Sequence, residues 1–338
     1  MNCYRIFKPK SKGTFIQRTE ELNTLLTDYL KTEEAEYRHL QYAKIFLSDA
    51  QNQYQQLVES NLYQNHLSAK AVTVVEQPPL DGSKISVLTK TTDGSDDFVF
   101  QSLRLSEDEV KGQSSYLQTM LLFNKYLNSI KNSGMTMGEN LVRTWIYVAD
   151  IDVNYSGVVR ARNDIFARYG LTADTHFVAS TGIGGYSATR HATVAMDFLS
   201  YPAIKEDDKK YLKALDHLNP THEYGVAFER GTRVETNDGQ RFFISGTASI
   251  DKHGDVLYLG DVGRQTARLL ENINALLNDG GASIDDVDYF IVYLRDLSDF
   301  PAVSAYMIER FPKTPFIIVE AKVCRPQWLI EMECTATI

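Results

Sequence analysis

The sequence repeats one order of secondary-structure signals, and this repeat limits the possible folds more than any other feature. The last copy is the clearest and begins with a hairpin at 232–251, whose alternating strands meet at an Asn-Asp-Gly turn. Leucines at helical spacing then predict an amphipathic helix at 264–281 that stops at two glycines. The copy continues as strand, helix, strand and strand at 289–296, 300–311, 316–323 and 328–337.

The same order of helix, strand, helix, strand and strand occurs twice upstream. The middle copy comprises residues 116–134, 142–150, 155–170, 177–181 and 192–198. The first copy is weaker and comprises residues 19–30, 42–49, 51–63, 71–80 and 84–92. The middle strand of each copy ends on an aspartate, at Asp49, Asp150 and Asp296.

Such a unit has one sheet with its helices on one face, so its other face needs a partner. We therefore predict an α+β fold of three tandem units, at 1–104, 105–210 and 211–338, whose open faces bury one another. This arrangement is a pseudo-trimer within one chain. It predicts a monomer with pockets at the seams between units.

Composition excludes several classes of function. The net charge of −9 argues against a general nucleic-acid or anionic-membrane surface. Three cysteines do not make a disulfide framework, and neither a signal peptide nor an apolar run of membrane-spanning length is present, so we expect a cytoplasmic protein. The histidines and cysteines show no metal-ligand spacing. We therefore expect no metal and no cofactor.

Three stretches of the last third, at 244–250, 269–287 and 319–336, resemble the Rid (YjgF) family. The resemblance implies a chorismate-mutase-like fold, trimers of a small α/β unit with sites between subunits, and often the hydrolysis of enamines and imines. Two features depart from that pattern. Phe316 stands where those deaminases usually place a substrate-binding arginine, and the chain is nearly three times as long as a Rid subunit.

A longer branch of this family fits more of the chain. The stretches that resemble the chorismatases cover roughly residues 105 to 338 and are 142–151, 161–166, 179–185, 224–231 and 324–331. Their order and spacing together are specific. The resemblance implies an enzyme that binds the dianion chorismate and releases its enolpyruvyl group as pyruvate.

Glu331 is the first candidate for catalysis. It interrupts an apolar terminal strand, where a carboxylate is costly unless it is used or paired, and Glu333 shares its face. Counting from Glu76 puts Val87 at the equivalent position of the first copy, so we expect one site per chain. Glu331 also falls at the catalytic glutamate of both Rid enzymes and chorismatases. A buried glutamic acid suits protonation of the terminal carbon of an enol ether.

Cys324 lies seven residues before Glu331 and is expected to face the same pocket. A cysteine at this place resembles the chorismatase branch that makes 3-hydroxybenzoate, and the predicted product rests on it. A free cysteine is otherwise a small core residue. Water as the replacing group would instead give a dihydroxycyclohexadiene carboxylate.

Arginines are the natural ligands of the two substrate carboxylates, because they bind carboxylates in bidentate fashion. Arg162, Arg230 and Arg325 lie in stretches that match the chorismatases. Arg143 joins them, because strand alternation puts it on one face with Trp145 and Tyr147, toward the seam. We expect one or two of these four arginines to have only structural roles.

Two further elements complete the predicted site. Tyr224 is expected to hydrogen-bond the substrate or, alternatively, to be a packed tyrosine. Residues 180–185 are interpreted as a glycine-rich loop, in which the backbone amides of Thr181 and Gly182 approach a carboxylate. The alternative is a plain tight turn.

Three hypotheses follow from the sequence. The first is a chorismatase with Glu331 as general acid and 3-hydroxybenzoate as the favoured product. The second is a Rid-type enamine or imine deaminase, and the third is a Rid-like small-molecule binding protein without catalysis. Only the first two require an acid at Glu331.

Overall fold

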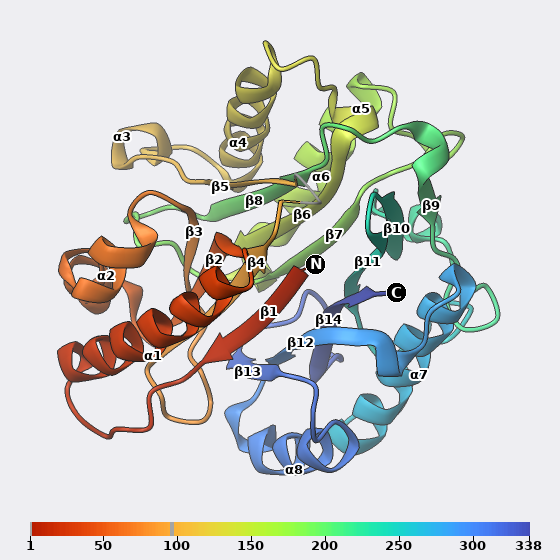
Figure 1. Cartoon of the computed structure of the whole chain (residues 1–338). Helices are drawn as coiled ribbons and strands as arrows, with labels where there is room; N and C mark the ends of the chain where they lie inside the picture. The colour runs from red at the N-terminus through yellow and green to blue at the C-terminus, as the bar shows by residue number, and fades with distance from the viewer. Residues whose placement is uncertain (1, 95–97) are drawn as a thin grey trace.

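The computed structural model describes residues 2–94 and 98–338 and has three sheets, each covered on its outer face by helices (Figure 1). The first unit contains β1 (Asn2–Phe7), α1 (Phe15–Ala35), β2 (His39–Leu47), α2 (Ala50–Glu59), the π-helical turn η1 (Tyr63–Leu67), β3 (Ala71–Glu76) and β4 (Ile85–Thr92). The second contains β5 (Val99–Leu103), α3 (Glu107–Val110), α4 (Ser115–Ile130), α5 (Met137–Asn140), β6 (Leu141–Val148), α6 (Ile151–Arg168), β7 (Ala179–Gly184) and β8 (Val194–Ser200).

The third unit is the largest and adds two strands to the common plan. Its helices and strands are β9 (Lys209–Tyr211), β10 (Gly231–Thr236), β11 (Gly239–Thr247), α7 (Val262–Gly280), β12 (Val287–Leu294), α8 (Phe300–Arg310), β13 (Phe316–Glu320) and β14 (Ile330–Thr337). Short 3-10 turns are η2 (Glu206–Asp208), η3 (Thr221–Tyr224), η4 (Ile284–Asp286) and η5 (Leu297–Asp299).

Sheet topology confirms the tandem repeat. The strand orders are β1-β4-β2-β3, β5-β8-β6-β7 and β13-β12-β14-β11-β10-β9. In each sheet the last strand of the copy pairs antiparallel with the middle strand, and the middle strand pairs in parallel with the strand that follows its helix. β1, β5 and β11 therefore occupy the same place in the three sheets. The predicted hairpin is confirmed, since β10 and β11 pair antiparallel from Thr236 and Gly239.

The pairing places two strands on the other side of the predicted unit boundaries. β5 precedes the boundary at 104 but belongs to the second sheet, where it pairs with β8. The boundary at 210 cuts β9, which pairs with β10 of the third sheet. Both strands are short and carry no strong alternation of apolar residues, so the sequence signal for them is weak.

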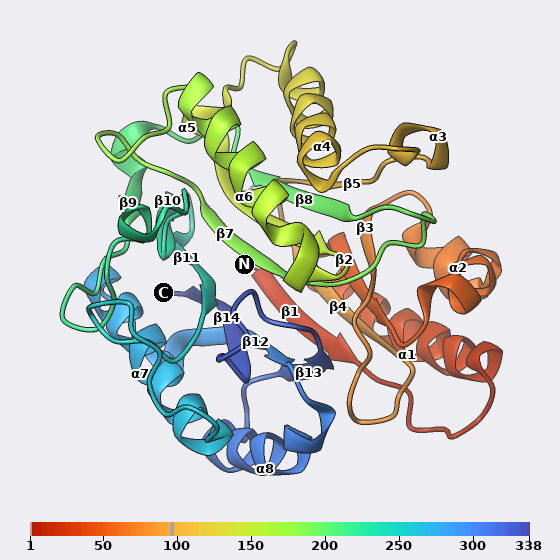
Figure 2. The ribbon, with the colours of Figure 1, turned by 180° about the vertical axis from the view of Figure 1, so that it is seen from behind.

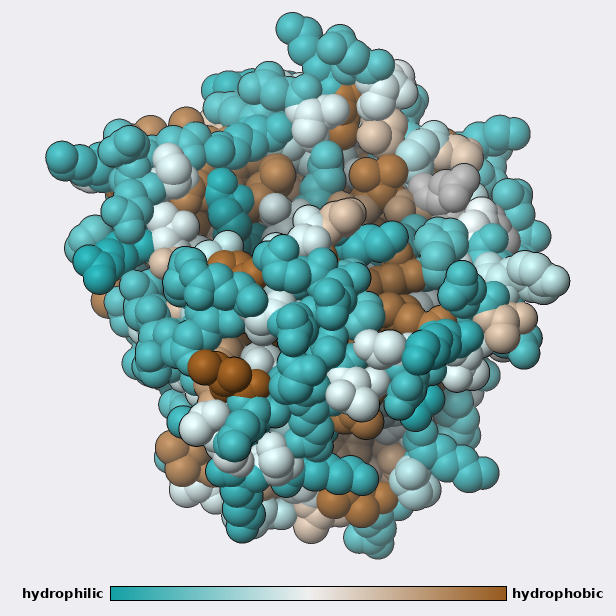
Figure 3. All heavy atoms as spheres, turned by 60° about the vertical axis from the view of Figure 1, so that its left-hand side comes forward, coloured by the Kyte–Doolittle hydropathy of each residue, from teal (hydrophilic) through white to brown (hydrophobic). Residues whose placement is uncertain are grey.

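The three open faces pack against one another. β3 contacts β5, β7 contacts β11 and β1 contacts β12, so each unit touches the other two. One buried cluster includes Phe46, Trp145 and Tyr293, one from each sheet. The helices lie outside this central core (Figure 1), as we expect for a pseudo-trimer within one chain. On the face shown in Figure 3, hydrophilic side chains predominate and apolar ones form small separate patches.

The aspartates that end the middle strands lie at the starts of the following helices. Asp49 caps α2 by accepting a hydrogen bond from the Asn52 amide, and Asp296 accepts one from Ser298. Asp150 precedes α6 in the left-handed region, with φ of 44°, and accepts a hydrogen bond from the Tyr186 hydroxyl instead. Each repeat therefore turns from strand to helix at the same point.

Candidate active site

A cavity of about 560 Å³ lies at the seam between the second and third units. Its walls come from α6, β7, the end of β11, the start of β14 and the segments around 224–230 and 324–328. Figure 2 shows α6 in front of the second sheet, with β7 beside β11. The structure brings seven of the predicted site residues to this wall, namely Arg162, Gly182, Tyr224, Arg230, Cys324, Arg325 and Glu331.

Glu331 projects from β14 opposite Tyr293 and is 4% exposed. Burial raises the pKa of this carboxyl to about 8, and the nearby charge of Glu333 acts in the same direction against the opposing effects of Arg230 and Arg143. Gly246 of β11 gives the carboxyl its space, because a Cβ at that position would overlap Glu331 Oε1. At neutral pH the site therefore holds an undissociated carboxylic acid.

Cys324 lies beside this acid, as predicted. Burial raises the pKa of its thiol to about 12, with a further contribution from the charge of Glu331 and against the opposing effects of Arg325 and Tyr155. The group is therefore a thiol and not a thiolate. Tyr155 on α6 was missed by the sequence reasoning, although it precedes Arg162 by seven residues and so shares its helix face.

Arg162 provides cationic hydrogen-bond donors that no protein group uses. The side chain is 1% exposed, and its Nε and Nη2 have no hydrogen-bond partner among the described residues. Its guanidinium carbon lies 5.6 Å from the centre of the Phe228 ring. Because an unpaired buried guanidinium is costly, this arrangement favours an anionic ligand in the cavity.

Arg325 lies between two aromatic rings at the same wall. Its guanidinium carbon is 5.0 Å from the Tyr224 ring centre and 4.8 Å from that of Trp328. Within the described parts of the chain, the indole Nε1 of Trp328 also lacks a partner. The aromatic rings orient the arginine while leaving donors available to a ligand.

Arg230 is held more firmly than the other two arginines. Its Nε and Nη2 donate to the Asn219 carbonyl oxygen at 3.3 and 3.0 Å, and Nη2 also donates to Asn219 Oδ1 at 3.2 Å. Its guanidinium carbon lies 5.5 Å from the Tyr224 ring centre. Burial raises the pKa of Tyr224, so its hydroxyl is a neutral donor at this wall.

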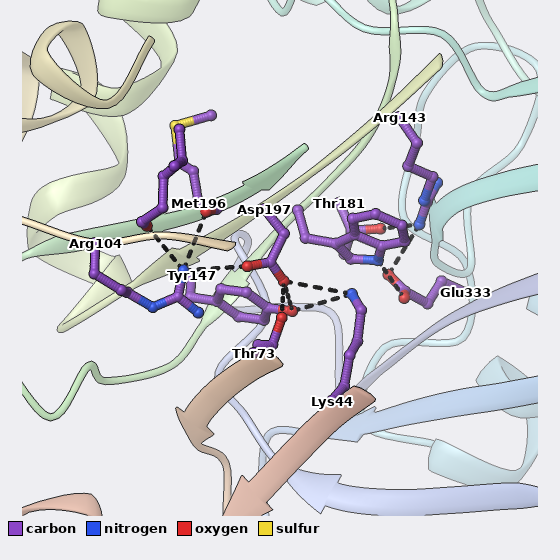
Figure 4. Close-up of polar contacts among 11 residues, drawn as sticks. Lys44, Thr73, Arg104, Arg143, Tyr147, Thr181, Met196, Asp197 and Glu333 are labelled. Carbon is purple, nitrogen blue, oxygen red and sulfur yellow. Dashed lines mark hydrogen bonds and ion pairs between the residues drawn. The ribbon is translucent and has the colours of Figure 1, made fainter. Parts of the chain in front are cut away.

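Arg143, Tyr147 and Thr181 lie outside the cavity wall, which corrects the place expected for them. Arg143 Nη2 donates to Glu333 Oε2 at 3.0 Å and to Thr181 Oγ1 at 2.7 Å. Trp145 Nε1 donates to Glu333 Oε1 at 2.7 Å, which completes a buried cluster (Figure 4). Alternation correctly identified the face of β6, but that face points to the molecular centre and not into the seam.

Tyr147 belongs to a second part of this central network. Its hydroxyl donates to Asp197 Oδ2 at 3.0 Å, and Lys44 Nζ lies 3.6 Å from the same oxygen (Figure 4). Lys44 also lies 3.4 Å from the centre of the Trp145 indole. Burial lowers the pKa of Lys44 to about 8, against the opposing charge of Asp197. The network connects the first unit to the second at their shared core.

The glycine-rich segment is a strand and not a loop, because residues 179–184 pair in parallel with β6 as β7. Its glycines allow close approach instead of a turn: a Cβ at Gly182 would lie 2.9 Å from the Tyr155 ring, and one at Gly184 would lie 2.8 Å from the Lys322 amide nitrogen. The amides of Ser180 and Gly184 donate to Ser245 Oγ and the Lys322 carbonyl oxygen. Because amides alternate in direction along a strand, the Gly182 amide points to the same edge of β7 as the amides of Ser180 and Gly184, whereas the Thr181 amide points to β6.

Strand register fixes the positions equivalent to Glu331. Glu331 pairs with Tyr293, one residue before the end of β12. The corresponding pairs are Phe46 with Ser86 in the first sheet and Tyr147 with Ala195 in the second. The equivalent residue of the first copy is therefore Ser86 and not Val87. Glu331 has no carboxylate counterpart at either position.

Residues 2–94 and 98–338 contain neither a metal-binding cluster nor a membrane-spanning helix. No group of three or more histidine, cysteine, aspartate or glutamate side chains in this range is placed to hold a metal ion. None of the helices described there has the length and apolar character needed to cross a membrane.

Comparison with known proteins assigns the third unit to a family. A family model described as endoribonuclease L-PSP matches residues 228–338. The 3-aminoacrylate deaminase RutC of Acinetobacter baylyi is 33% identical over 98 residues, which are 28% of this chain and 78% of the relative. A RutC family protein of Pyrococcus abyssi is 38% identical over 100 residues, 29% of this chain and 79% of the relative. The chain therefore belongs to the RutC, or Rid, family, as the sequence motifs indicated.

The whole chain has a more specific structural counterpart. A crystal structure of a chorismatase matches 99% of this chain and 98% of its own length, with a TM-score of 0.69 and 18% sequence identity. The tandem arrangement of Rid-like units is thus the chorismatase fold, which confirms the fold expected from the sequence.

Proposed function

We propose that this protein is a chorismatase that releases the enolpyruvyl group of chorismate as pyruvate. One observation carries the proposal: the cavity holds a buried carboxylic acid, Glu331, whose pKa is raised to about 8, and the same cavity is lined by a buried Arg162 with unpaired donors. An acid that keeps its proton at neutral pH suits protonation of carbon, and the cation suits a carboxylate substrate. The cavity volume lies within the usual range of small-ligand sites.

The substrate is held by its two carboxylates. Arg162 and Arg325 face the cavity with available donors, and Arg230 adds positive charge from a fixed position. Tyr224 and Trp328 supply neutral donors beside them. Together these groups offset the desolvation of a dianion in a chain that is acidic as a whole.

Glu331 acts as general acid in the first step. Its proton goes to the terminal methylene carbon of the enol ether, and the side chain becomes an oxocarbenium ion. The ring hydroxyl then displaces the ether oxygen from the neighbouring ring carbon and returns its proton to the Glu331 carboxylate, and the side chain departs as pyruvate. The resulting epoxide opens with loss of a ring proton to 3-hydroxybenzoate. Chorismate is thereby divided into hydroxybenzoate and pyruvate without consuming water.

Cys324 supports the choice of 3-hydroxybenzoate over the dihydrodiol. Its partly buried thiol lines the same cavity as Glu331 and Tyr155. We infer that this uncharged sulfur occupies the space in which water would attack. Because the thiol stays protonated, we assign it a role in shaping the pocket and not in nucleophilic attack.

The test is turnover of chorismate with both products identified. Pyruvate is followed by a coupled assay, and the ring product is identified by chromatography and by mass after reaction in ¹⁸O-water. We expect pyruvate and 3-hydroxybenzoate whose ring oxygens come only from chorismate. A dihydrodiol would identify a hydrolytic chorismatase instead; it carries one ¹⁸O atom if water attacks the ring carbon and none if water adds to the oxocarbenium carbon. No pyruvate above the uncatalysed rate would overturn the proposal.

A Rid-type enamine deaminase is the second candidate, because the RutC relative is named as a 3-aminoacrylate deaminase. The place of its expected arginine argues against it. Phe316 begins β13 next to Lys8, whose Nζ lies 5.9 Å from the ring centre, and it does not line the cavity of Glu331. Ammonia release from 2-aminoacrylate generated in the assay would favour this candidate.

We also retain two predictions about the protein in the cell. The three open sheet faces cover one another within the chain, so we propose that it acts as a monomer, which size-exclusion chromatography with light scattering tests. The described cysteines, Cys3, Cys324 and Cys334, are all free, which supports a reducing cytoplasmic location. Fractionation of cells that express the natural protein tests the location.

A further inference from the structure

The seam between the first and second units also encloses a cavity, of about 430 Å³. Its walls come from α2, η1, β3 and β5 and from the segment at 187–189. β3 and β5 hold the places in their sheets that β7 and β11 hold at the seam with Glu331. The second cavity therefore occupies the position that the repeat makes equivalent to the candidate active site.

Strand register shows that the correspondence extends to single residues of β3 and β7. Glu76 pairs with the last residue of β2, and Gly184 pairs with the last residue of β6. Glu76 and Gly184 are therefore equivalent. Two residues before them, Val74 is equivalent to Gly182, and four residues before them, Val72 is equivalent to Ser180. Val72 and Val74 line the second cavity, and Ser180 and Gly182 line the first.

The helix and the neighbouring strand correspond in the same way. Tyr54 is the fifth residue after Asp49, and Tyr155 is the fifth after Asp150. Each tyrosine lines its own cavity. Ser102 on β5 is equivalent to Gly246 on β11. The residue after Ser102 pairs with Met196 of β8, and the residue after Gly246 pairs with the equivalent Met332 of β14. Four positions therefore contribute to both cavities.

Arg104 supplies a cation to the second cavity. Its Nη1 donates to Asp197 Oδ1 and to the Met196 carbonyl oxygen, both at 3.1 Å, while Nη2 is buried without a partner among the described residues (Figure 4). Asp197 is also the carboxylate that lies beside buried Lys44. Two cations thus share one carboxylate, and an anion at Nη2 would balance the charge.

We propose that this second cavity is a non-catalytic binding site for a small aromatic monocarboxylate. Tyr54, Tyr63 and the two valines provide the walls for a ring, and Arg104 provides the carboxylate contact. Glu107 is exposed at the rim and disfavours a dianion. Ala195 stands where the active site has Glu331, so the second cavity has no general acid at the catalytic position. The inference does not require that chorismate is the substrate.

Binding of 3-hydroxybenzoate, measured by calorimetry and equilibrium dialysis, tests this proposal. Ser102→Trp fills the second cavity and leaves Arg104 in place, whereas Arg162→Gln alters only the cavity of Glu331. We expect one binding event that is lost in Ser102→Trp and kept in Arg162→Gln. Tyr54→Ala, at a 38% exposed helix position, should weaken the same event at least tenfold and serves if the tryptophan variant does not fold.

The proposal is overturned if every binding event survives both Ser102→Trp and Tyr54→Ala, or if all binding disappears in Arg162→Gln. These outcomes are independent of the chorismatase proposal, which depends on pyruvate release. Benzoate and chorismate serve as further probes. We expect benzoate to compete at the second cavity and chorismate to compete at least tenfold less well.

Discussion

Replacement of Glu331 by Gln tests the role of the buried acid most directly. The substitution keeps the shape of the side chain but removes its dissociable proton. At pH 7 a carboxyl with a pKa of about 8 is roughly 90% protonated, whereas one at the ordinary value of 4.5 is about 0.3% protonated. The environment therefore raises the population of the active form about 300-fold. We expect Glu331→Gln to lower kcat by about 10²–10⁴ with little change in chorismate binding.

The pH dependence of the wild-type enzyme gives a second readout. We expect kcat to fall as pH rises through about 8, because Glu331 then loses its proton. Stability should change in a defined window as well. Between about pH 4.5 and 8 the folded protein holds this proton and the unfolded chain does not, so the free energy of unfolding decreases as pH rises. Glu331→Gln removes this contribution and should be more stable than wild type above pH 8.

The assays are steady-state pyruvate release from pH 5 to 10 and urea unfolding at pH 5 and pH 9. Glu320→Gln is the matched control, since Glu320 is exposed on β13 and does not line the active-site cavity. A Glu331→Gln variant that keeps kcat within tenfold of wild type, or a wild-type rate that is flat through pH 8, would refute the reasoning.

Three further substitutions give separate tests. Cys324→Ala should admit water and shift the product toward the dihydrodiol, as measured by chromatography; an unchanged product ratio would remove Cys324 from product choice. Arg162→Gln should raise KM about 10- to 100-fold, because a charged hydrogen bond to the substrate is lost, while apo stability is unchanged or higher. If Arg162→Gln and the wild-type enzyme had equal KM values, Arg162 would be excluded as a ligand of a substrate carboxylate. Glu333→Gln leaves Arg143 buried without its ion pair and should cost about 3–5 kcal/mol in urea unfolding; a cost under 1 kcal/mol would contradict that structural role.

The fold could be predicted largely from periodicity, because each repeat alternates long helices with strongly apolar strands. The hairpin at β10 and β11 and the middle strands were predicted within a few residues. β5 and β9 were harder, since they are short and owe their place to pairing with distant strands. The glycines of β7 suggested a loop, whereas they serve the close approach of Tyr155 and Lys322.

The candidate site was predictable where one residue type stood out against its surroundings. Glu331 lies in an apolar stretch, and Cys324, Arg162, Arg230 and Arg325 lie in stretches that resemble the chorismatases. Alternation was insufficient for Arg143, because it identifies which residues share a face of β6 but not whether that face points to the molecular centre or to the seam. The network around Lys44 and Asp197 joins residues more than 150 positions apart, and no local pattern predicts such pairing.

The equivalence of Ser86, Ala195 and Glu331 has a consequence for how this protein can change. In a trimer of identical subunits, every mutation appears three times, so no single site can acquire a new role while the others keep theirs. When the units are joined in one chain, each unit has its own sequence and can mutate separately from the other two. One seam can retain the acid while another loses it, and selection can then act on each pocket independently.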